Sequence, residues 1–191
     1  MPSKKNRIPV LPGKAYHIYN RGNNYEKVFF NQEDYKTFLN KIKEYLLNYV
    51  DVYAYALIDN HFHWAIRVKD KPFISFANEY SKFILHYTNK VNFEQKRSGS
   101  LFLNPFKRIE IENEEYLKRL VFYIHYNPEK HKLTSNYKLY PFSSYQAFLS
   151  NKPSGIDRDY VLNIYGSIDE FREYHQYLSN LNGSDKFSLE D

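Results

Sequence analysis

Two histidines, His61 and His63, lie one residue apart in the apolar segment 61–68. Successive side chains of a strand point to opposite faces, so we expect both imidazoles on one face and Phe62 on the other. Two imidazoles about 7 Å apart on one face can converge on a single divalent cation. The alternative interpretation is a pair of polar residues on the solvent face of an antiparallel sheet.

A second group of candidate functional residues lies near the end of a helix predicted from residue 112 onward. Tyr123 and Asn127 are four residues apart and would share a face of a continuous helix. However, Pro128 disfavours helical geometry at Asn127, and Asn-Pro-Glu is also typical of the N-cap of a new short helix. Tyr123 can equally be a packed core residue, since the chain has 20 tyrosines.

The remaining periodicities predict the elements that position these residues. We expect a strand at 14–20, a loop at 21–24, a helix capped by Asn31, and strands at 50–58 and 61–68 joined by an Asp59-Asn60 turn. A helix at 73–91, a basic loop at 93–100 and an extended segment at 101–111 follow. This order predicts an α+β fold, a ferredoxin-like split βαβ antiparallel sheet with helices on one face. Residues 135–182 are expected to form a helical C-terminal extension packed on the core at 1–134, with a disordered tail at 183–191.

Composition limits the protein class. The chain has 191 residues and no cysteine, which excludes disulfides and thiolate metal sites and favours a reducing bacterial cytoplasm. It contains no run of eighteen apolar residues and no signal-peptide pattern, so we expect no membrane association. A formal charge of +5 with many aromatic residues is compatible with nucleic-acid binding, although an AT-rich genome would give a similar composition.

Several short motifs occur in an order found in one known family. Through these motifs, residues 14–134 resemble the IS200-like single-tyrosine transposases of the HUH superfamily, and more narrowly the transposases associated with repetitive extragenic palindromes. The motifs are Tyr-His-Ile-Tyr-Asn-Arg-Gly at 16–22, Asn-His-Phe-His at 60–63, Gly-Ser-Leu-Phe at 99–102, Pro-Phe-Lys-Arg at 105–108 and Tyr-Ile-His-Tyr-Asn-Pro at 123–128.

The resemblance implies a role for each residue of the candidate site. It implies that His61 and His63 bind a metal ion, that Tyr123 is the nucleophile, and that the ion is Mg²⁺ or Mn²⁺. Asn127 stands where relatives often have a metal-binding Gln, and Asp59 stands where many have Pro. The imidazoles alone would suit Zn²⁺ or Mn²⁺ better than Mg²⁺.

The activity implied by the resemblance is cleavage and rejoining of single-stranded DNA beside hairpins, through a covalent 5′-phosphotyrosine. A homodimer is an alternative to a monomer. Two other functions stay open: a domesticated, non-catalytic protein that binds DNA or RNA hairpins, and a metal-dependent nuclease that uses water.

For His17 and His125 we expect structural, hydrogen-bonded roles. Candidate phosphate contacts are Arg21, Lys96, Arg97, Lys107 and Arg108, with Lys4, Lys5 and Arg7 in a mobile N-terminal arm.

Overall fold

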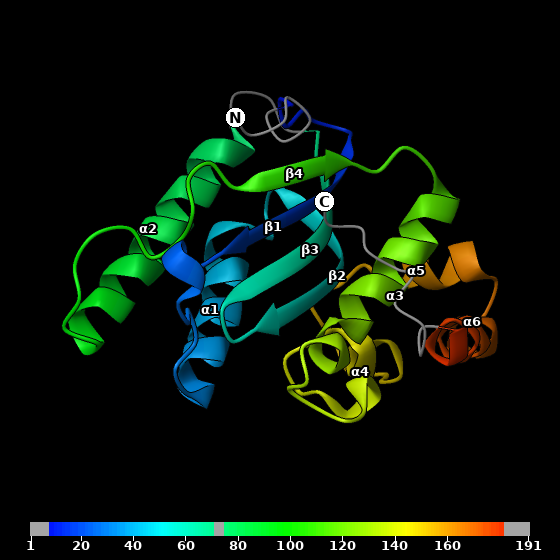
Figure 1. Cartoon of the computed structure of the whole chain (residues 1–191). Helices are drawn as coiled ribbons and strands as arrows, with labels where there is room; N and C mark the ends of the chain where they lie inside the picture. Colours follow the sequence, from blue (N-terminus) through cyan, green and yellow to red (C-terminus); the bar gives the residue numbers. More distant parts are fainter. Residues whose placement is uncertain (1–7, 71–74, 182–191) are drawn as a thin grey trace.

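A four-stranded antiparallel sheet forms the centre of the molecule in the computed structural model, which describes residues 8–70 and 75–181 (Figure 1). The strand order is β2-β3-β1-β4, as expected for the split βαβ arrangement. The elements are β1 (Ala15–Arg21), α1 (Gln32–Tyr45), β2 (Val50–Ile58), β3 (His61–Val68), α2 (Phe76–Glu94), β4 (Lys107–Glu110), α3 (Glu114–Lys130), α4 (Tyr145–Phe148), α5 (Arg158–Tyr165) and α6 (Ile168–Leu181), with short 3-10 turns at Asn23–Tyr25 and Tyr137–Leu139.

The two crossover helices, α1 and α2, cover one face of the sheet (Figure 1). Asn31 caps α1 as predicted: its side chain accepts a hydrogen bond from Asp34 N, and the Asp34 carboxylate accepts one in return from Asn31 N. Phe38 of α1 packs against Phe62 and Trp64 of β3 in the first buried cluster. The alternation along β3 therefore sends its large apolar side chains to this face.

Helix α3 covers the opposite face of the sheet, where small residues lie beneath it. Ala54, Ala56 and Ala65 are fully buried in a second cluster together with Leu120 and Tyr123 of α3. Because alanine has only a methyl side chain, the helix can approach the strands closely. This approach brings the middle of α3 onto the face that carries His61 and His63.

Pro128 does not end α3, and of the two alternatives the continuous helix is correct and the new helix capped by Asn127 is wrong. The helix continues to Lys130, and Asn127 O accepts a hydrogen bond from His131 N at 2.9 Å. Proline removes one N–H donor, but the last helical turn still closes around it. Tyr123 and Asn127 therefore share one helix face, one turn apart.

A buried polar chain connects α3 to the C-terminal helices. His125 Nδ1 lies 3.0 Å from His175 Nε2, and His125 Nε2 lies 2.8 Å from Ser144 Oγ. His175 Nδ1 donates to Phe171 O at 2.8 Å, and Ser144 Oγ accepts from Tyr55 N at 2.9 Å. The structural role expected for His125 is confirmed, because all three side chains are fully or almost fully buried and each has partners.

The other differences from the sequence-based elements are small. Helix α2 (Phe76–Glu94) extends past the expected end at 91, so the basic loop begins later. Arg21 belongs to β1 rather than to a loop. Helix α6 extends over 14 residues. No helix within the described ranges is long and apolar enough to cross a membrane. The predicted arm with Lys4, Lys5 and Arg7, the start of the predicted second helix at Phe73 and the predicted tail at 183–191 lie outside the described residues.

Candidate active site

Strand β3 places His61 and His63 on the face beneath α3, as the alternation predicts. Their ring centroids lie 5.1 Å apart and their planes are nearly perpendicular. His63 is fully buried, whereas His61 is half-buried at the end of the strand. In the sheet register His63 pairs with Tyr19, and His61 pairs with Arg21. The pair thus belongs to a row of polar and aromatic side chains that crosses the sheet.

Neighbouring groups hold both imidazoles in defined orientations. His61 Nδ1 lies 2.6 Å from Asn60 Oδ1, and because that oxygen can only accept, His61 Nδ1 is the donor. The Nε2 atom of neutral His61 then carries the lone pair. His63 Nδ1 lies 2.9 Å from His17 Nε2; when Nδ1 donates in this bond, Nε2 of His63 also carries a lone pair. Such second bonds are typical of metal-binding histidines.

Helix α3 brings Asn127 and Tyr123 to these histidines. Asn127 Oδ1 lies 3.2 Å from His61 Nε2, and the Asn127 side chain is fully buried. The Tyr123 ring stands edge-on to His63, with centroids 5.5 Å apart, and to His17, with centroids 6.2 Å apart. Tyr123 is 2% exposed and its hydroxyl is buried. All four residues singled out from the sequence are therefore brought together.

The chemistry of these atoms fits a divalent cation. His61 Nε2 and Asn127 Oδ1 lie 3.2 Å apart. An imidazole nitrogen and an amide oxygen can both coordinate a divalent cation, so one ion could contact both atoms. Within residues 8–70 and 75–181 there is no group of three or more His, Cys, Asp or Glu side chains that could hold a metal ion. An ion here would therefore depend on two imidazoles and an amide oxygen.

A cavity of about 410 Å³ opens beside His61 and has cationic walls. Arg21 places its guanidinium 4.0 Å from the centre of the Tyr25 ring, and Lys107 Nζ lies 5.4 Å from the centre of the Tyr19 ring. All four side chains line this cavity. Two of the five predicted phosphate contacts, Arg21 and Lys107, thus flank the histidine pair.

The other three predicted phosphate contacts are placed differently. Arg108 lies opposite Ile18 in the register, so it points to the α2 face; its Nε donates to Ile8 O, and burial lowers its pKa. Arg97 pairs with Glu26 at 2.8 Å, close to the turn that carries Tyr25. Lys96 follows the end of α2 with a positive φ of 51° and is exposed.

Sequence reasoning missed several residues that lie at this site. His131 lies with its ring centroid 4.6 Å from that of His61 and lines the same cavity. Lys130 Nζ lies 5.2 Å from the centre of the Tyr123 ring. Both follow Pro128, where the sequence left open whether the helix continues. His17, for which we expected a hydrogen-bonded structural role, makes its hydrogen bond to His63 itself. The alternation of His17 and Tyr19 along the predicted strand 14–20 was the signal that could have found it.

Comparison with known families and with curated proteins gave no match for this chain. Comparison with solved structures did. A REP-associated tyrosine transposase bound to a REP hairpin aligns with a TM-score of 0.62 and 15% sequence identity, covering 79% of this chain and 88% of that one. A bacterial tRNA(His) guanylyltransferase-like protein aligns less well, with TM-scores of 0.47 in its GTP complex and 0.45 in its ATP complex. The alignment with the GTP complex has 11% identity and covers 67% of this chain and 68% of that one. The alignment with the ATP complex has 12% identity and covers 87% of this chain and 76% of that one.

The alignment with the transposase extends over most of both chains. An identity of 15% supports the likeness of fold rather than of individual residues. This chain therefore has the fold of a REP-associated tyrosine transposase.

Proposed function

We propose that this protein cleaves and rejoins single-stranded DNA next to hairpins, with Tyr123 as nucleophile and a divalent ion held by His61, His63 and Asn127. The observation that carries the proposal is the juxtaposition across β3 and α3: a phenol ring 5.5 Å from one imidazole, and an amide oxygen 3.2 Å from the other. The solved structure with the same fold is a transposase bound to a hairpin, which supports this substrate class.

The chemistry follows from the properties of a phosphodiester. A divalent ion bound by Nε2 of each histidine and Oδ1 of Asn127 would polarise a nonbridging oxygen and offset the charge of the transition state. The phenolic oxygen of Tyr123, after losing its proton, forms a bond to phosphorus, and the bond to the 3′ oxygen breaks to release a 3′ hydroxyl. Because the phosphotyrosine keeps the phosphodiester bond energy, another 3′ hydroxyl can reverse the step without ATP.

Other side chains around the site support this reaction. Arg21 and Lys107 would bind the flanking phosphates in the cavity beside His61. A phenol ionises with a pKa near 10, so it is a poor nucleophile at neutral pH. The Lys130 ammonium lies 5.2 Å from the ring centre of Tyr123, within reach of a cation–π contact, and adds positive charge beside the proposed nucleophile.

One observation favours a second candidate function, non-catalytic hairpin binding. The Tyr123 hydroxyl is buried, so attack on DNA requires a local movement that exposes it. A hairpin-binding protein would need no such movement. The two functions differ in whether a covalent protein–DNA bond forms and in whether binding depends on metal and on His61.

The proposal predicts a metal-dependent covalent adduct. The protein is incubated with Mn²⁺ or Mg²⁺ and a pool of DNA hairpins with randomised single-stranded flanks, labelled at the 3′ end, because the 3′ fragment stays on the protein. We expect a labelled adduct on a denaturing gel, its loss with chelator and its return with Mn²⁺. His61→Ala should lower the adduct yield about 100-fold through loss of an ion ligand.

The matched control is His86→Ala, since His86 is an exposed histidine on α2. Its adduct yield should equal that of the wild type. A wild type that binds hairpins with equal affinity with and without metal, and forms no adduct with any member of the pool, would establish the non-catalytic function instead. Cleaved DNA without a protein-linked fragment would indicate a nuclease that uses water.

The cationic walls of the cavity predict a salt-dependent contribution to DNA binding. Arg21→Gln and Lys107→Gln should each weaken hairpin binding about fivefold, and each should reduce the slope of log K against log salt by about 1. Arg108→Gln is the control, because Arg108 lies on the same strand as Lys107 but on the opposite face. Fluorescence anisotropy at several salt concentrations measures both quantities. Equal slopes for all three variants would contradict the placement of DNA in this cavity.

A further inference from the structure

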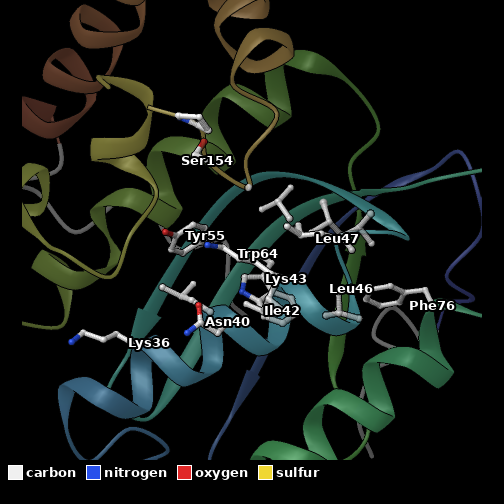
Figure 2. A pocket seen from close by; sticks show the side chains of 16 residues that line it. Lys36, Asn40, Ile42, Lys43, Leu46, Leu47, Tyr55, Trp64, Phe76 and Ser154 are labelled. Atoms are coloured by element: carbon white, nitrogen blue, oxygen red, sulfur yellow. The ribbon is translucent and has the colours of Figure 1, made fainter. Parts of the chain in front are cut away.

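A second cavity, of about 450 Å³, lies on the α1 side of the sheet, away from the histidine pair (Figure 2). Its walls come from α1, from β2 and β3, from Phe76 at the start of α2, and from the segment 153–155. Ile42, Leu46, Val52 and Ile66 supply apolar lining. The volume falls in the range of small-molecule sites, which are mostly apolar with a few polar groups.

Trp64 gives this cavity an unsatisfied polar group. Trp64 is 3% exposed and lines the cavity, and its indole Nε1 has no hydrogen-bond partner in the part of the chain that the structure describes. An indole N–H can only donate, and a buried donor without a partner costs free energy. Figure 2 shows Trp64 near the middle of the lining side chains, beside Tyr55. A ligand that brings an acceptor atom would remove this cost.

The charged residues that line the cavity, among those that the structure describes, are all basic. Lys36 and Lys43 of α1 are exposed and line it, together with the amide of Asn40. Lys36 lies 3.8 Å from Glu33, an exposed pair that contributes little and does not prevent binding of another anion. None of the described lining residues is acidic. Figure 2 shows Lys36 at the end opposite Phe76, so a cationic end faces an apolar one.

From these observations we propose that this cavity binds a small organic anion with an apolar body, of the medium-chain monocarboxylate class. The apolar body lies against Leu46, Ile66 and Phe76, and the carboxylate accepts from the Trp64 indole or pairs with Lys36 and Lys43. Trp64 directly follows His63 in β3, so the site shares a strand with the proposed active site but lies on its other face. The inference does not depend on the proposed function, because it concerns binding alone.

The test uses Trp64 as its own reporter, because it is the only tryptophan of the chain. The full chain, labelled with ¹⁵N, is titrated with octanoate, and the single indole N–H cross-peak is followed by NMR. We expect a saturable shift of this peak. The uncharged analogue 1-octanol should bind at least about fivefold more weakly, since it lacks the attraction of the lysines.

Substitutions separate the contribution of the lysines from that of the apolar lining. The double variant Lys36→Gln, Lys43→Gln should weaken octanoate binding at least about fivefold and leave octanol binding unchanged. Lys41→Gln is the control, because Lys41 lies on the same helix but does not line the cavity. No saturable shift up to about 10 mM octanoate would overturn the proposal. Equal affinities for octanoate and octanol, unaffected by the double variant, would also overturn it and indicate a site for an uncharged apolar group, such as a side chain of a protein partner.

Discussion

Tyr123→Phe is expected to abolish the covalent protein–DNA adduct, with a reduction of at least about 10³-fold. Phenylalanine keeps the ring that stands edge-on to His63 and His17, so the packing of α3 on the sheet is preserved. The variant lacks only the oxygen that would bond to phosphorus. The measurement is the denaturing-gel assay with 3′-labelled hairpins, together with mass spectrometry of the DNA-linked peptide.

The control for this substitution is a neighbouring tyrosine of the same helix. Tyr126 packs against Phe122 and Tyr137, away from the histidine pair, so Tyr126→Phe should give the wild-type yield of adduct. Hairpin binding by Tyr123→Phe should also be retained. An adduct that persists in Tyr123→Phe, or a linked peptide that lacks residue 123, would contradict the assignment of the nucleophile.

Acidification is expected to destabilise the fold through the buried pair of His125 and His175. Burial lowers the pKa of His125 well below its usual range and that of His175 to about 3. In the unfolded chain both groups have a pKa near 6.5, so between about pH 6.5 and pH 3 the unfolded state binds more protons. The stability is therefore complete above pH 6.5 and declines as the pH falls. Between pH 7 and pH 5 each histidine should lower the free energy of unfolding by about 2 kcal/mol.

Urea unfolding at several pH values measures this loss. His175→Gln should remove about half of it, since the glutamine amide does not titrate, whereas His86→Gln should leave the wild-type dependence on pH. A loss of about 4 kcal/mol is a large fraction of the stability of a typical domain. A difference between wild type and His175→Gln that is constant from pH 7 to pH 5 would contradict the prediction.

Much of the fold and part of the site could be predicted from the sequence, because the spacing of apolar residues indicates which face of a helix or strand is buried. The alternation at 61–68 located β3 and oriented His61 and His63, and the Asn31 cap fixed the start of α1. The resemblance supplied roles for Tyr123 and Asn127, and the structure places both side chains beside the histidines.

The rest depended on contacts between distant segments, which local patterns do not encode. Pro128 signals a helix end, but packing of α3 on the sheet keeps the helix intact to Lys130. With the continuation of the helix left open by the sequence, Lys130 and His131 were not among the candidate residues. Similarly, a row of cations in the sequence does not show that Lys107 faces the site while Arg108 faces α2, because this depends on the register of β4 against β1.

The alanines beneath α3 set the depth at which Tyr123 lies above the sheet. Ala54, Ala56 and Ala65 have no reactive atoms, yet they act as a spacer of fixed thickness between helix and strands. A divergent chain with the same histidines and tyrosine but with bulkier residues in these three places would hold its phenol further from the imidazoles. Small side chains under the helix are thus a criterion, beside the histidines and the tyrosine, for finding the same arrangement in distant sequences.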